Sequence, residues 1–420
     1  MKTAHRPEEI KDVFARQILD SRGNPTVEAE VKTWSGVIGR AAVPAGASTG
    51  THEALELRDG EKRLYGGKSV LKAVRNIREI IGPRIVGAFC HDQQGIDKAM
   101  IELDGTANKS TLGANAMLAV SMAAMRASAL VKGEPLFRRI STKDQYSLPC
   151  PMMNVINGGA HAGTHLAVQE FLIEPLGTDS FEESLRVCAE VYHSLKNVLK
   201  NKYGPTATNV GDEGGYALPV DKSEQALDAI TKAVTEAGYD DSVVKLGIDS
   251  AATNFYDAKK GVYRIDGGQL SPGELLEYYV DLSSRYPLRT IEDPFHEEGF
   301  SDFAALTSRI GGSVLIIGDD IYVTNRSLIE NGLKHHSSNA VLIKLNQIGT
   351  VTETLEAIHY CDSAGLATVV SHRSGETDDA FISHLAVAVG SPYLKAGAPA
   401  RGERTAKYNE LLRIEENLDR

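Results

Sequence analysis

The sequence predicts an α/β protein in which a parallel β/α barrel follows a smaller α+β domain. Six strand-like runs lie in the later part of the chain, separated by helix-like segments, and one of them, residues 340–343, is apolar without polar alternation. Such a run is typical of a strand buried on both faces, as in a parallel sheet. Five of the six are followed at once by a charged side chain, and the active site of a β/α barrel lies at these strand ends. The runs are residues 243–248, 288–291, 314–318, 340–343, 366–370 and 392–394.

The length of the chain requires more than one ordinary domain. It has 420 residues, and its 42% hydrophobic content allows a large core. A polar stretch that ends in a proline-flanked segment, residues 141–149, separates the two patterns. We therefore expect a first domain over residues 1–143 and a barrel domain over residues 144–420.

Composition and charge disfavour several functions. A net charge of −11 and the lack of a basic run argue against nucleic-acid binding. The four cysteines form no C-x-x-C pair, which favours a reduced, cytoplasmic setting. Residues 1–17 are charged and lack the apolar core of a signal peptide. The long apolar window at residues 112–131 is interrupted by Asn115 and Arg126, so it predicts a buried helix and no membrane span.

The first domain begins with a strand pattern. Residues 27–34 alternate apolar and polar side chains, and a turn at Ser35 and Gly36 leads to a second strand over residues 37–43. The small-residue loop at 44–50 is either a structural turn or an active-site lid. Helical segments are predicted at residues 67–81, 91–103 and 113–132.

The barrel is expected to begin with two strands, residues 151–156 and 169–173, and a helix over residues 181–203. Between the strands, His161 and His165 have the spacing of a helical metal pair, but the surrounding glycines argue against a helix and against zinc. The glycine-flanked pair Asp212 and Glu213 is either a solvated turn or part of a site. Nucleotide binding is not indicated, because the sequence has neither a G-x-G-x-x-G motif after a strand nor a P-loop.

Charged residues at successive strand ends predict a metal site beside a base. Asp249, Glu292 and Asp319 follow three successive strands, and Lys344 follows the next one. Taken alone, Lys344 could be a lysine that reaches out to solvent at the strand end. Because all four strand ends meet at one face of a barrel, the carboxylates and the lysine are expected to lie together.

The ordered set of motifs resembles the enolase family over essentially the whole chain. Matching segments are residues 15–27, 46–50, 157–159, 169–171, 209–215, 291–295, 318–320, 345–350, 371–377 and 397–401. The resemblance implies a smaller N-terminal α+β domain that caps a modified TIM barrel, ββαα(βα)6, with an antiparallel second strand. It also implies dehydration of 2-phosphoglycerate to phosphoenolpyruvate, a reaction of glycolysis and gluconeogenesis.

The resemblance also implies roles for residues. Asp249, Glu292 and Asp319 match the ligands of one magnesium ion, and Ser48 matches the loop residue that reaches a second. Lys344 matches the base and Glu213 the acid. The remaining matches lie beside the substrate or its leaving group: His161, Gln169, Glu170, His372, Arg373, Ser374 and Lys395. Asp293 and Asp320 each follow a ligand and are interpreted as supporting residues.

The proposed chemistry sets two expectations about proton affinity. Burial and nearby cations, Arg373 and Lys395 among them, should lower the pKa of Lys344 so that it can act as a base. Repulsion from Glu170 should raise the pKa of Glu213 so that it can act as an acid.

Two alternatives remain open. One is a related enzyme acting on a non-phosphorylated acid, against which Arg373, Ser374 and Lys395 argue, because a phosphate needs them. The other is a binding protein that reuses the scaffold, for instance at a cell surface. The resemblance further implies a homodimer or larger homo-oligomer.

Overall fold

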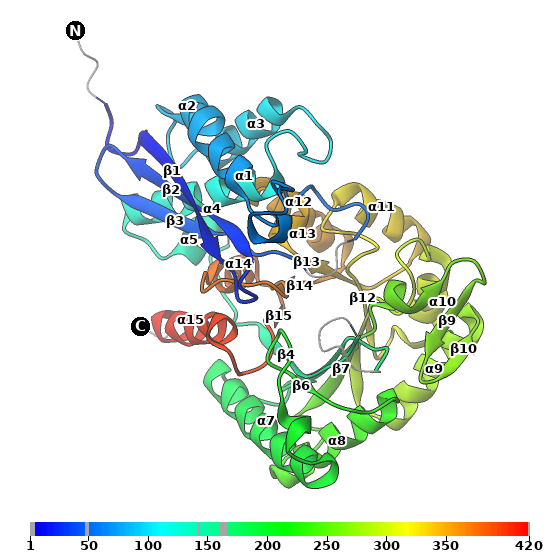
Figure 1. Cartoon of the computed structure of the whole chain (residues 1–420). Coiled ribbons are helices and arrows are strands. Elements are labelled where there is room, and N and C mark those ends of the chain that lie inside the picture. Colours follow the sequence, from blue (N-terminus) through cyan, green and yellow to red (C-terminus); the bar gives the residue numbers. More distant parts are fainter. Residues whose placement is uncertain (1–4, 47–49, 142, 160–165, 419–420) are drawn as a thin grey trace.

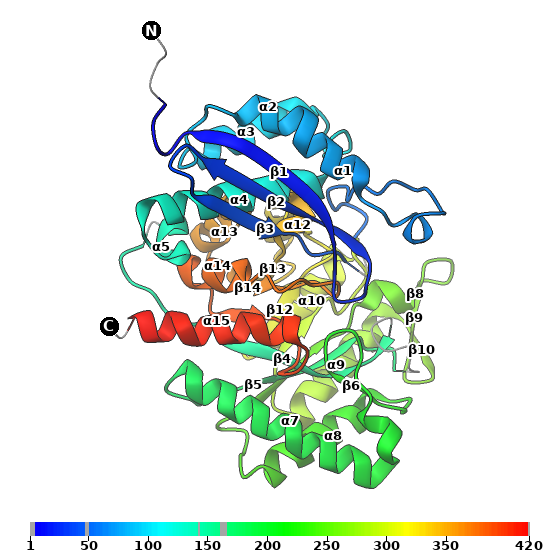
Figure 2. The ribbon, with the colours of Figure 1, turned by 60° about the vertical axis from the view of Figure 1, so that its left-hand side comes forward.

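The computed structural model describes residues 5–46, 50–141, 143–159 and 166–418. A smaller N-terminal part lies against one side of a barrel, and helix α15 near the C-terminus runs along the barrel (Figures 1 and 2). The N-terminal part is α+β, and the second part is a closed barrel surrounded by helices, as the sequence predicted.

The N-terminal part starts with a three-stranded antiparallel sheet in the order β1–β2–β3. Its strands are β1 (Ile10–Leu19), β2 (Pro25–Thr33) and β3 (Ile38–Ala42). Sequence analysis missed β1, because a register shift between Ile10 and Asp12 breaks the alternation that marks a strand. The helices that follow are α1 (Leu71–Asn76), the π-helical turn η2 (Ile77–Ile81), α2 (Gly82–Ile85), α3 (Gln93–Asp104), α4 (Ala114–Lys132) and α5 (Leu136–Ile140).

Helix α4 is the core helix of the N-terminal part. It packs against β2 and β3, and a Cβ on Gly39 of β3 would lie only 2.1 Å from the carbonyl oxygen of Ala123. Among the described residues, α4 is the one helix long and apolar enough to cross a membrane, and 83% of its apolar window is buried inside the protein. Such burial is typical of a core helix, so the prediction of a buried helix is confirmed.

Eight strands close the barrel, since β15 also pairs with β4. In chain order they are β4 (Cys150–Asn157), β5 (Glu170–Glu174), β7 (Lys245–Asp249), β11 (Leu288–Glu292), β12 (Leu315–Gly318), β13 (Ala340–Ile343), β14 (Ala367–Ser371) and β15 (Tyr393–Lys395). Strand β5 runs antiparallel to both of its neighbours. The short strand β6 (Tyr216–Ala217) pairs with β4 in addition.

The helices complete the expected ββαα(βα)6 order. They are α7 (Phe181–Tyr203), α8 (Ser223–Glu236), α9 (Pro272–Arg285), α10 (Phe300–Ile310), α11 (Arg326–His335), α13 (Val351–Ala364), α14 (Phe381–Val389) and α15 (Gly402–Leu418). A one-turn helix, α12 (Leu345–Ile348), follows β13, and a small sheet of β8 (Tyr256–Asp257), β9 (Val262–Ile265) and β10 (Gly268–Leu270) precedes α9.

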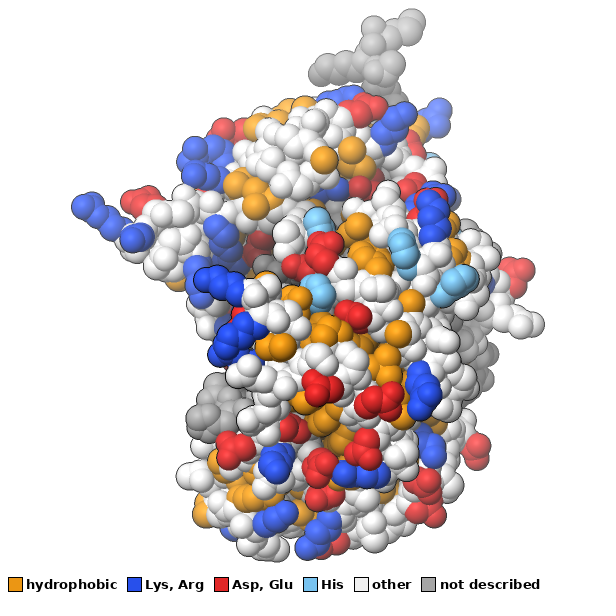
Figure 3. All heavy atoms as spheres, turned by 90° about the vertical axis from the view of Figure 1, so that its right-hand side faces the viewer, with side chains coloured by type: hydrophobic (Ala, Val, Ile, Leu, Met, Phe, Trp, Pro, Cys, Tyr) orange, Lys and Arg blue, Asp and Glu red, His pale blue; other side chains and the backbone are white. Residues whose placement is uncertain are grey.

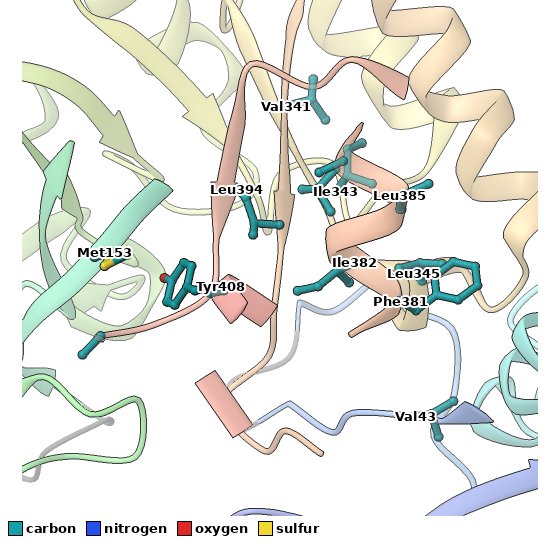
Figure 4. Close-up of a cluster of buried hydrophobic side chains, with 14 of the residues drawn as sticks. Val43, Met153, Val341, Ile343, Leu345, Phe381, Ile382, Leu385, Leu394 and Tyr408 are labelled. Carbon is teal, nitrogen blue, oxygen red and sulfur yellow. The ribbon is translucent and has the colours of Figure 1, made fainter. Parts of the chain in front are cut away.

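Two apolar cores follow from the pleat of the strands. Side chains that point into the barrel form one cluster: Met152, Leu172, Ile317, Ala340, Leu342, Val369 and Tyr393. Alternate side chains of the same strands, such as Val341 and Ile343, point outward. There they belong to the cluster that includes Phe381 and Leu385 of α14 and Val43 from the N-terminal part (Figure 4). One continuous core therefore joins the barrel to the N-terminal part. It fixes the positions of the barrel strands relative to that part.

Candidate active site

The antiparallel strand β5 brings three carboxylates into one row. Its first residue, Glu170, lies opposite Asp249, the last residue of β7, and Asp249 lies opposite Glu292, the last residue of β11. A parallel β5 would have placed its first residue at the other end of the barrel. The reversed strand thus adds Glu170 to the charged residues that were predicted at the strand ends. We call this end of the barrel the rim.

Lys395, the last residue of β15, contacts all three carboxylates of this row. Its Nζ lies 3.1 Å from Glu170, 3.0 Å from Asp249 and 2.8 Å from Glu292. All four side chains are buried, and a buried charge is tolerated only when it is paired. Burial lowers the pKa of Lys395, but attraction by Asp249 and the two glutamates outweighs it and holds the pKa well above its usual range.

The second rim lysine has a single close carboxylate. The Nζ of Lys344 donates to Oδ2 of Asp319, while Gln347 donates to the other oxygen, Oδ1, at 2.9 Å. The backbone N–H of Lys344 donates to Thr324, whose hydroxyl donates in turn to Gln347. Lys344 is thus held at the strand end and does not reach out to solvent.

The pKa of Lys344 bears on one expectation. Burial, the largest single cause, lowers it, and so do Arg373 and Lys395, as expected, but attraction by Asp319 and Glu292 acts in the opposite direction and the net pKa is raised. The predicted lowering also counted bound magnesium, so it stays a prediction for the metal-bound site, and the direct contact with Asp319 was not foreseen from the sequence. Burial raises the pKa of Asp319, but Lys344 more than offsets this and the net pKa is lowered.

Carboxylate oxygens at the rim fit a hard divalent cation. Asp293, Asp319 and Asp320 each offer an oxygen within 4.8 Å of the others. Asp293 uses both of its oxygens to accept the backbone N–H groups of Asp319 and Asp320, so it holds the turn. Within the described part of the chain, Oε1 of Glu292 is buried without a hydrogen-bond partner. A cation would supply the missing partner, and oxygen ligands of this kind suit Mg²⁺.

The rim groups differ in proton affinity. Burial raises the pKa of Glu170 well above its usual range, and repulsion by Glu213 adds to the rise. The pKa of Glu292 is raised by burial and by Asp249. Burial and Asp319 raise the pKa of Asp320 to about 7. The rim is therefore crowded with negative charge that two lysines only partly compensate.

Glu213 contacts a residue of β4 and a residue that follows β14. Asn154 of β4 donates to its Oε2 at 3.0 Å, and Nε2 of His372 lies 3.8 Å from the same oxygen. Burial holds the pKa of His372 well below its usual range. Glu213 and His372 are each 2% exposed, which excludes the solvated-turn interpretation of Glu213.

Arg373 forms a bidentate pair with Glu53, a residue that sequence analysis did not single out. The two nitrogen–oxygen distances are 3.0 and 3.1 Å, and Arg373 also donates to Asn346 at 2.9 Å. Glu53 comes from the N-terminal part and Arg373 from the barrel, so the site spans both. The 320-residue separation along the chain left no sequence signal for this pair.

Most of the predicted site residues line one cavity. They are Gln169, Glu170, Glu213, Asp249, Asp319, Lys344, His372, Arg373, Ser374 and Lys395. Glu292 contacts Lys395, which lines the cavity, at 2.8 Å. The predicted residues Ser48 and His161 lie outside the described residues. Arg404 was also missed; it lies on the buried face of α15, which carries a second buried cation, Lys407.

The fold and the site define a class of protein: a β/α barrel with an α+β domain against it and a cavity lined by buried carboxylates and lysines at the strand ends. Family models agree with this, since the enolase N-terminal domain matches residues 10–140 and the enolase C-terminal TIM barrel domain matches residues 145–420. The chain therefore belongs to the enolase family, whose members are phosphopyruvate hydratases of glycolysis and, as a family, depend on Mg²⁺.

Relatives named enolase cover nearly the whole chain. The protein of Methanothrix thermoacetophila is 55% identical over 410 residues, which are 98% of this chain and 96% of the relative. The protein of Methanocaldococcus jannaschii is 54% identical with the same coverage of both chains. That of Thermococcus gammatolerans is 53% identical over 98% of this chain and 96% of its own.

Proposed function

We propose that this protein catalyses the reversible dehydration of 2-phosphoglycerate to phosphoenolpyruvate, with Lys344 as the base and Glu213 as the acid. The observation that carries the proposal is their placement: both line one cavity, together with Lys395, Arg373 and the carboxylates of the rim. The reaction removes a proton from the carbon beside the substrate carboxylate and a hydroxyl group from the next carbon. Two separate groups can therefore serve as the base and the acid.

Asp249, Glu292 and Asp319 would hold one magnesium ion, and Ser48 would contribute to a second. The support is the register of the strand ends and the unpartnered oxygen of Glu292. Bound magnesium would supply positive charge to the substrate carboxylate as negative charge develops on it, an effect of at least several kcal/mol.

Lys344 must be neutral to accept the proton from C2 of the substrate. Asp319 is both its partner and a proposed cation ligand, so its charge would be divided between the two. Burial, Arg373 and Lys395, which already act to lower the pKa of Lys344, would then dominate. After proton transfer, Asp319 would stabilise the ammonium group.

Glu213 would protonate the leaving hydroxide. Glu213 and Glu170 repel each other, which raises the pKa of Glu170, so this pair of carboxyl groups is expected to retain a proton between them at neutral pH. Glu170, Gln169 and His161 would surround the leaving hydroxyl.

Arg373, Ser374, Lys395 and His372 would bind the two anionic ends of the substrate. Arg373 offers a planar fork of donors that matches phosphate. Its present partner, Glu53, shows that the guanidinium already holds a carboxylate in this position. A substrate phosphate would compete with Glu53 for the same donors.

The first test is the ultraviolet absorbance of phosphoenolpyruvate formed from 2-phosphoglycerate, with magnesium and then with excess chelator. We expect a rise that the chelator abolishes. A folded protein that gives no rise with magnesium would refute the proposed function.

A second test separates the two proton-transfer groups. Lys344→Ala should abolish both dehydration and exchange of the C2 hydrogen with solvent, whereas Glu213→Gln should lose dehydration and retain exchange. The opposite pattern would show that the two roles are reversed. Lys334→Ala, an exposed lysine on α11, is the matched control and should leave both reactions unchanged.

The wider setting follows from the same proposal. We propose a first domain over residues 1–143, a barrel domain over 144–420, and a homodimer or larger homo-oligomer in the cytoplasm. All four cysteines are unpaired, as expected in a reducing compartment. The face drawn in Figure 3 shows acidic and basic side chains interspersed. Size measurement in solution tests the oligomer.

A further inference from the structure

Arg404 is a fully buried cation in the first turns of α15, with a relative exposure of 0%. Its Nε lies 3.4 Å from Glu403 in an ion pair, and its two terminal nitrogens make four closer contacts. Nη1 lies 2.6 Å from Nδ1 of His372 and donates to the carbonyl of Arg373 at 2.7 Å. Nη2 donates to the carbonyls of Ser374 at 2.5 Å and Asp212 at 3.0 Å. Each of these four acceptors belongs to, or directly precedes, a residue proposed for the site.

These contacts join two segments that approach the cavity from different directions. Residues 372–374 follow β14, and the turn containing Asp212 and Glu213 precedes β6. The segment after β15 is tied to the same turn, since Ala398 N–H donates to the Glu213 carbonyl at 2.9 Å. Gly397, at φ +86°, leaves room there: a Cβ would lie 2.8 Å from both Arg404 Cδ and the Glu213 carbonyl.

The contact with His372 fixes the position of its proton. An arginine guanidinium has donors only and stays charged. Nδ1 of His372, at 2.6 Å, must therefore be an acceptor and carry no proton. The ring is neutral with its proton on Nε2, the nitrogen that faces Glu213 at 3.8 Å. Burial and the charge of Arg404 both keep the pKa of His372 low, consistent with this state.

We propose that Arg404 is a positioning residue that sets the acid turn and the anion-binding segment relative to one another and holds His372 as the Nε2–H tautomer. The inference rests on the proposed roles of Glu213, His372 and Arg373, and it extends them to a residue that touches no substrate. Through its four acceptors, Arg404 aligns the group that donates a proton with the groups that bind the substrate anion.

Lys407, one turn further along α15, offers a matched comparison. It is likewise 0% exposed, and its Nζ lies 2.8 Å from Glu376. It also donates to the carbonyl of Thr377. Among the described residues, it forms no hydrogen bond or ion pair with His372 or with the Asp212 turn. Removal of either cation leaves buried partners unpaired and destabilises the fold, but only Arg404 should control the tautomer.

The test compares wild type with Arg404→Met, Arg404→Lys, Arg404→Ala and Lys407→Met, using kcat and KM for phosphoenolpyruvate formation. Arg404→Met should lower kcat by about 100-fold, the cost of a small misplacement in a catalytic site. Guanidinium ion should restore at least roughly a tenth of the lost rate in Arg404→Ala, because it can refill the site of the side chain. It should not restore any loss in Lys407→Met. Arg404→Lys should be intermediate.

A spectroscopic readout separates positioning from stability. Nitrogen NMR of histidine-labelled protein, with the His372 signal assigned by its loss in His372→Gln, should show an unprotonated Nδ1 in wild type. Arg404→Met should shift that signal toward a mixture of tautomers, whereas Lys407→Met should leave it in place. If Arg404→Met folds with wild-type kcat, or if no Arg404 variant moves the signal and guanidinium rescues nothing, the inference is overturned.

Failure of the proposed function would be distinct. Wild type would then form no phosphoenolpyruvate, while the NMR signal of His372 would still report the tautomer. If Arg404→Met does not fold, the milder Arg404→Lys and the rescue of Arg404→Ala decide the same question.

Discussion

Strand β5 carries a glutamate at each end, and the two experience different surroundings. Glu170 lies at the rim of the barrel, 3.1 Å from Lys395, in a row with Asp249 and Glu292. Glu174 is fully buried at the opposite end of the barrel, which we call the floor. It accepts a hydrogen bond from Thr290, and within the described residues its other oxygen has no partner.

The floor has cations nearby but none in contact with Glu174. Lys245 lies opposite it in the register, yet the ion pair of Lys245 is with Asp241, at 3.6 Å. Arg289 donates to the carbonyl of Ser313 and only attracts Glu174 from a distance. Burial therefore raises the pKa of Glu174 to about 8, so it is mostly protonated at neutral pH.

The difference shows two solutions to the same problem of burying a carboxyl group. At the floor the carboxyl group has no cation in contact and gives up its charge, whereas at the rim Lys395 keeps its own charge by contacting three carboxyl groups, two of which also have raised pKa values. Retained charge is costly unless it is used, so the rim is where function is expected. Substitutions at the rim should mainly affect activity, and substitutions at the floor should mainly affect stability.

Replacing Lys395 with Met should have the largest effect. Glu170, Asp249 and Glu292 would lose their common cation, and leaving a buried charge unpaired costs roughly 3–5 kcal/mol. The proposed substrate contact would also be lost, so phosphoenolpyruvate formation should fall by about 10²–10³-fold. Enzyme assays and thermal melting measure the two effects.

Lys245→Met is the matched control for the rim prediction. This lysine is at the opposite end of β7 from Asp249, and its loss should leave activity within a factor of about two, as for a surface ion pair. Comparable activity losses in both variants would remove the distinction between rim and floor.

The sequence allowed much of the rim to be predicted, because each of Asp249, Glu292, Asp319, Lys344 and Lys395 ends or directly follows an apolar run. The length of those runs and the barrel geometry bring such residues together without any knowledge of long-range contacts. Residues whose partners are distant in the chain escaped prediction. Glu53 and Arg404 interact with the segment 372–374, and no spacing rule connects them.

Glu174 shows why direction matters as much as pattern. It follows the apolar run 171–173 just as Asp249 follows its own run. Only the antiparallel course of β5, which the family resemblance implied and the strand pairing confirms, sends it to the floor. The actual partner of Lys344 was also missed, since local sequence does not reveal which of several carboxylates a flexible side chain contacts.

Glu174→Gln should change how stability depends on pH. The pKa of Glu174 rises from 4.5 to about 8 on folding, so between these values the unfolded chain releases a proton that the folded chain keeps. Wild type should therefore lose roughly 3–5 kcal/mol of stability as pH rises through this window, with no further loss from this group above it. The glutamine variant lacks this contribution.

Denaturant unfolding of both proteins between pH 5 and pH 9 measures the effect. The stability difference between variant and wild type should shift in favour of the variant as pH rises, while activity stays near that of wild type. Glu356→Gln, an exposed site on α13, should run parallel to wild type. Parallel curves for Glu174→Gln would mean that the floor carboxyl group is ionised in the folded protein.

Gly247→Ala should have the smallest effect and would sharpen the picture of the floor. A Cβ at Gly247 would lie 2.2 Å from the Thr290 hydroxyl and 2.5 Å from Oε1 of Glu174, so the glycine creates the space in which this pair meets. Overpacking of this kind costs about 1–3 kcal/mol. In the Glu174→Ala background part of the clash disappears, so the two effects on unfolding free energy should be less than additive. Full additivity would show that Thr290, and not Glu174, bears the clash.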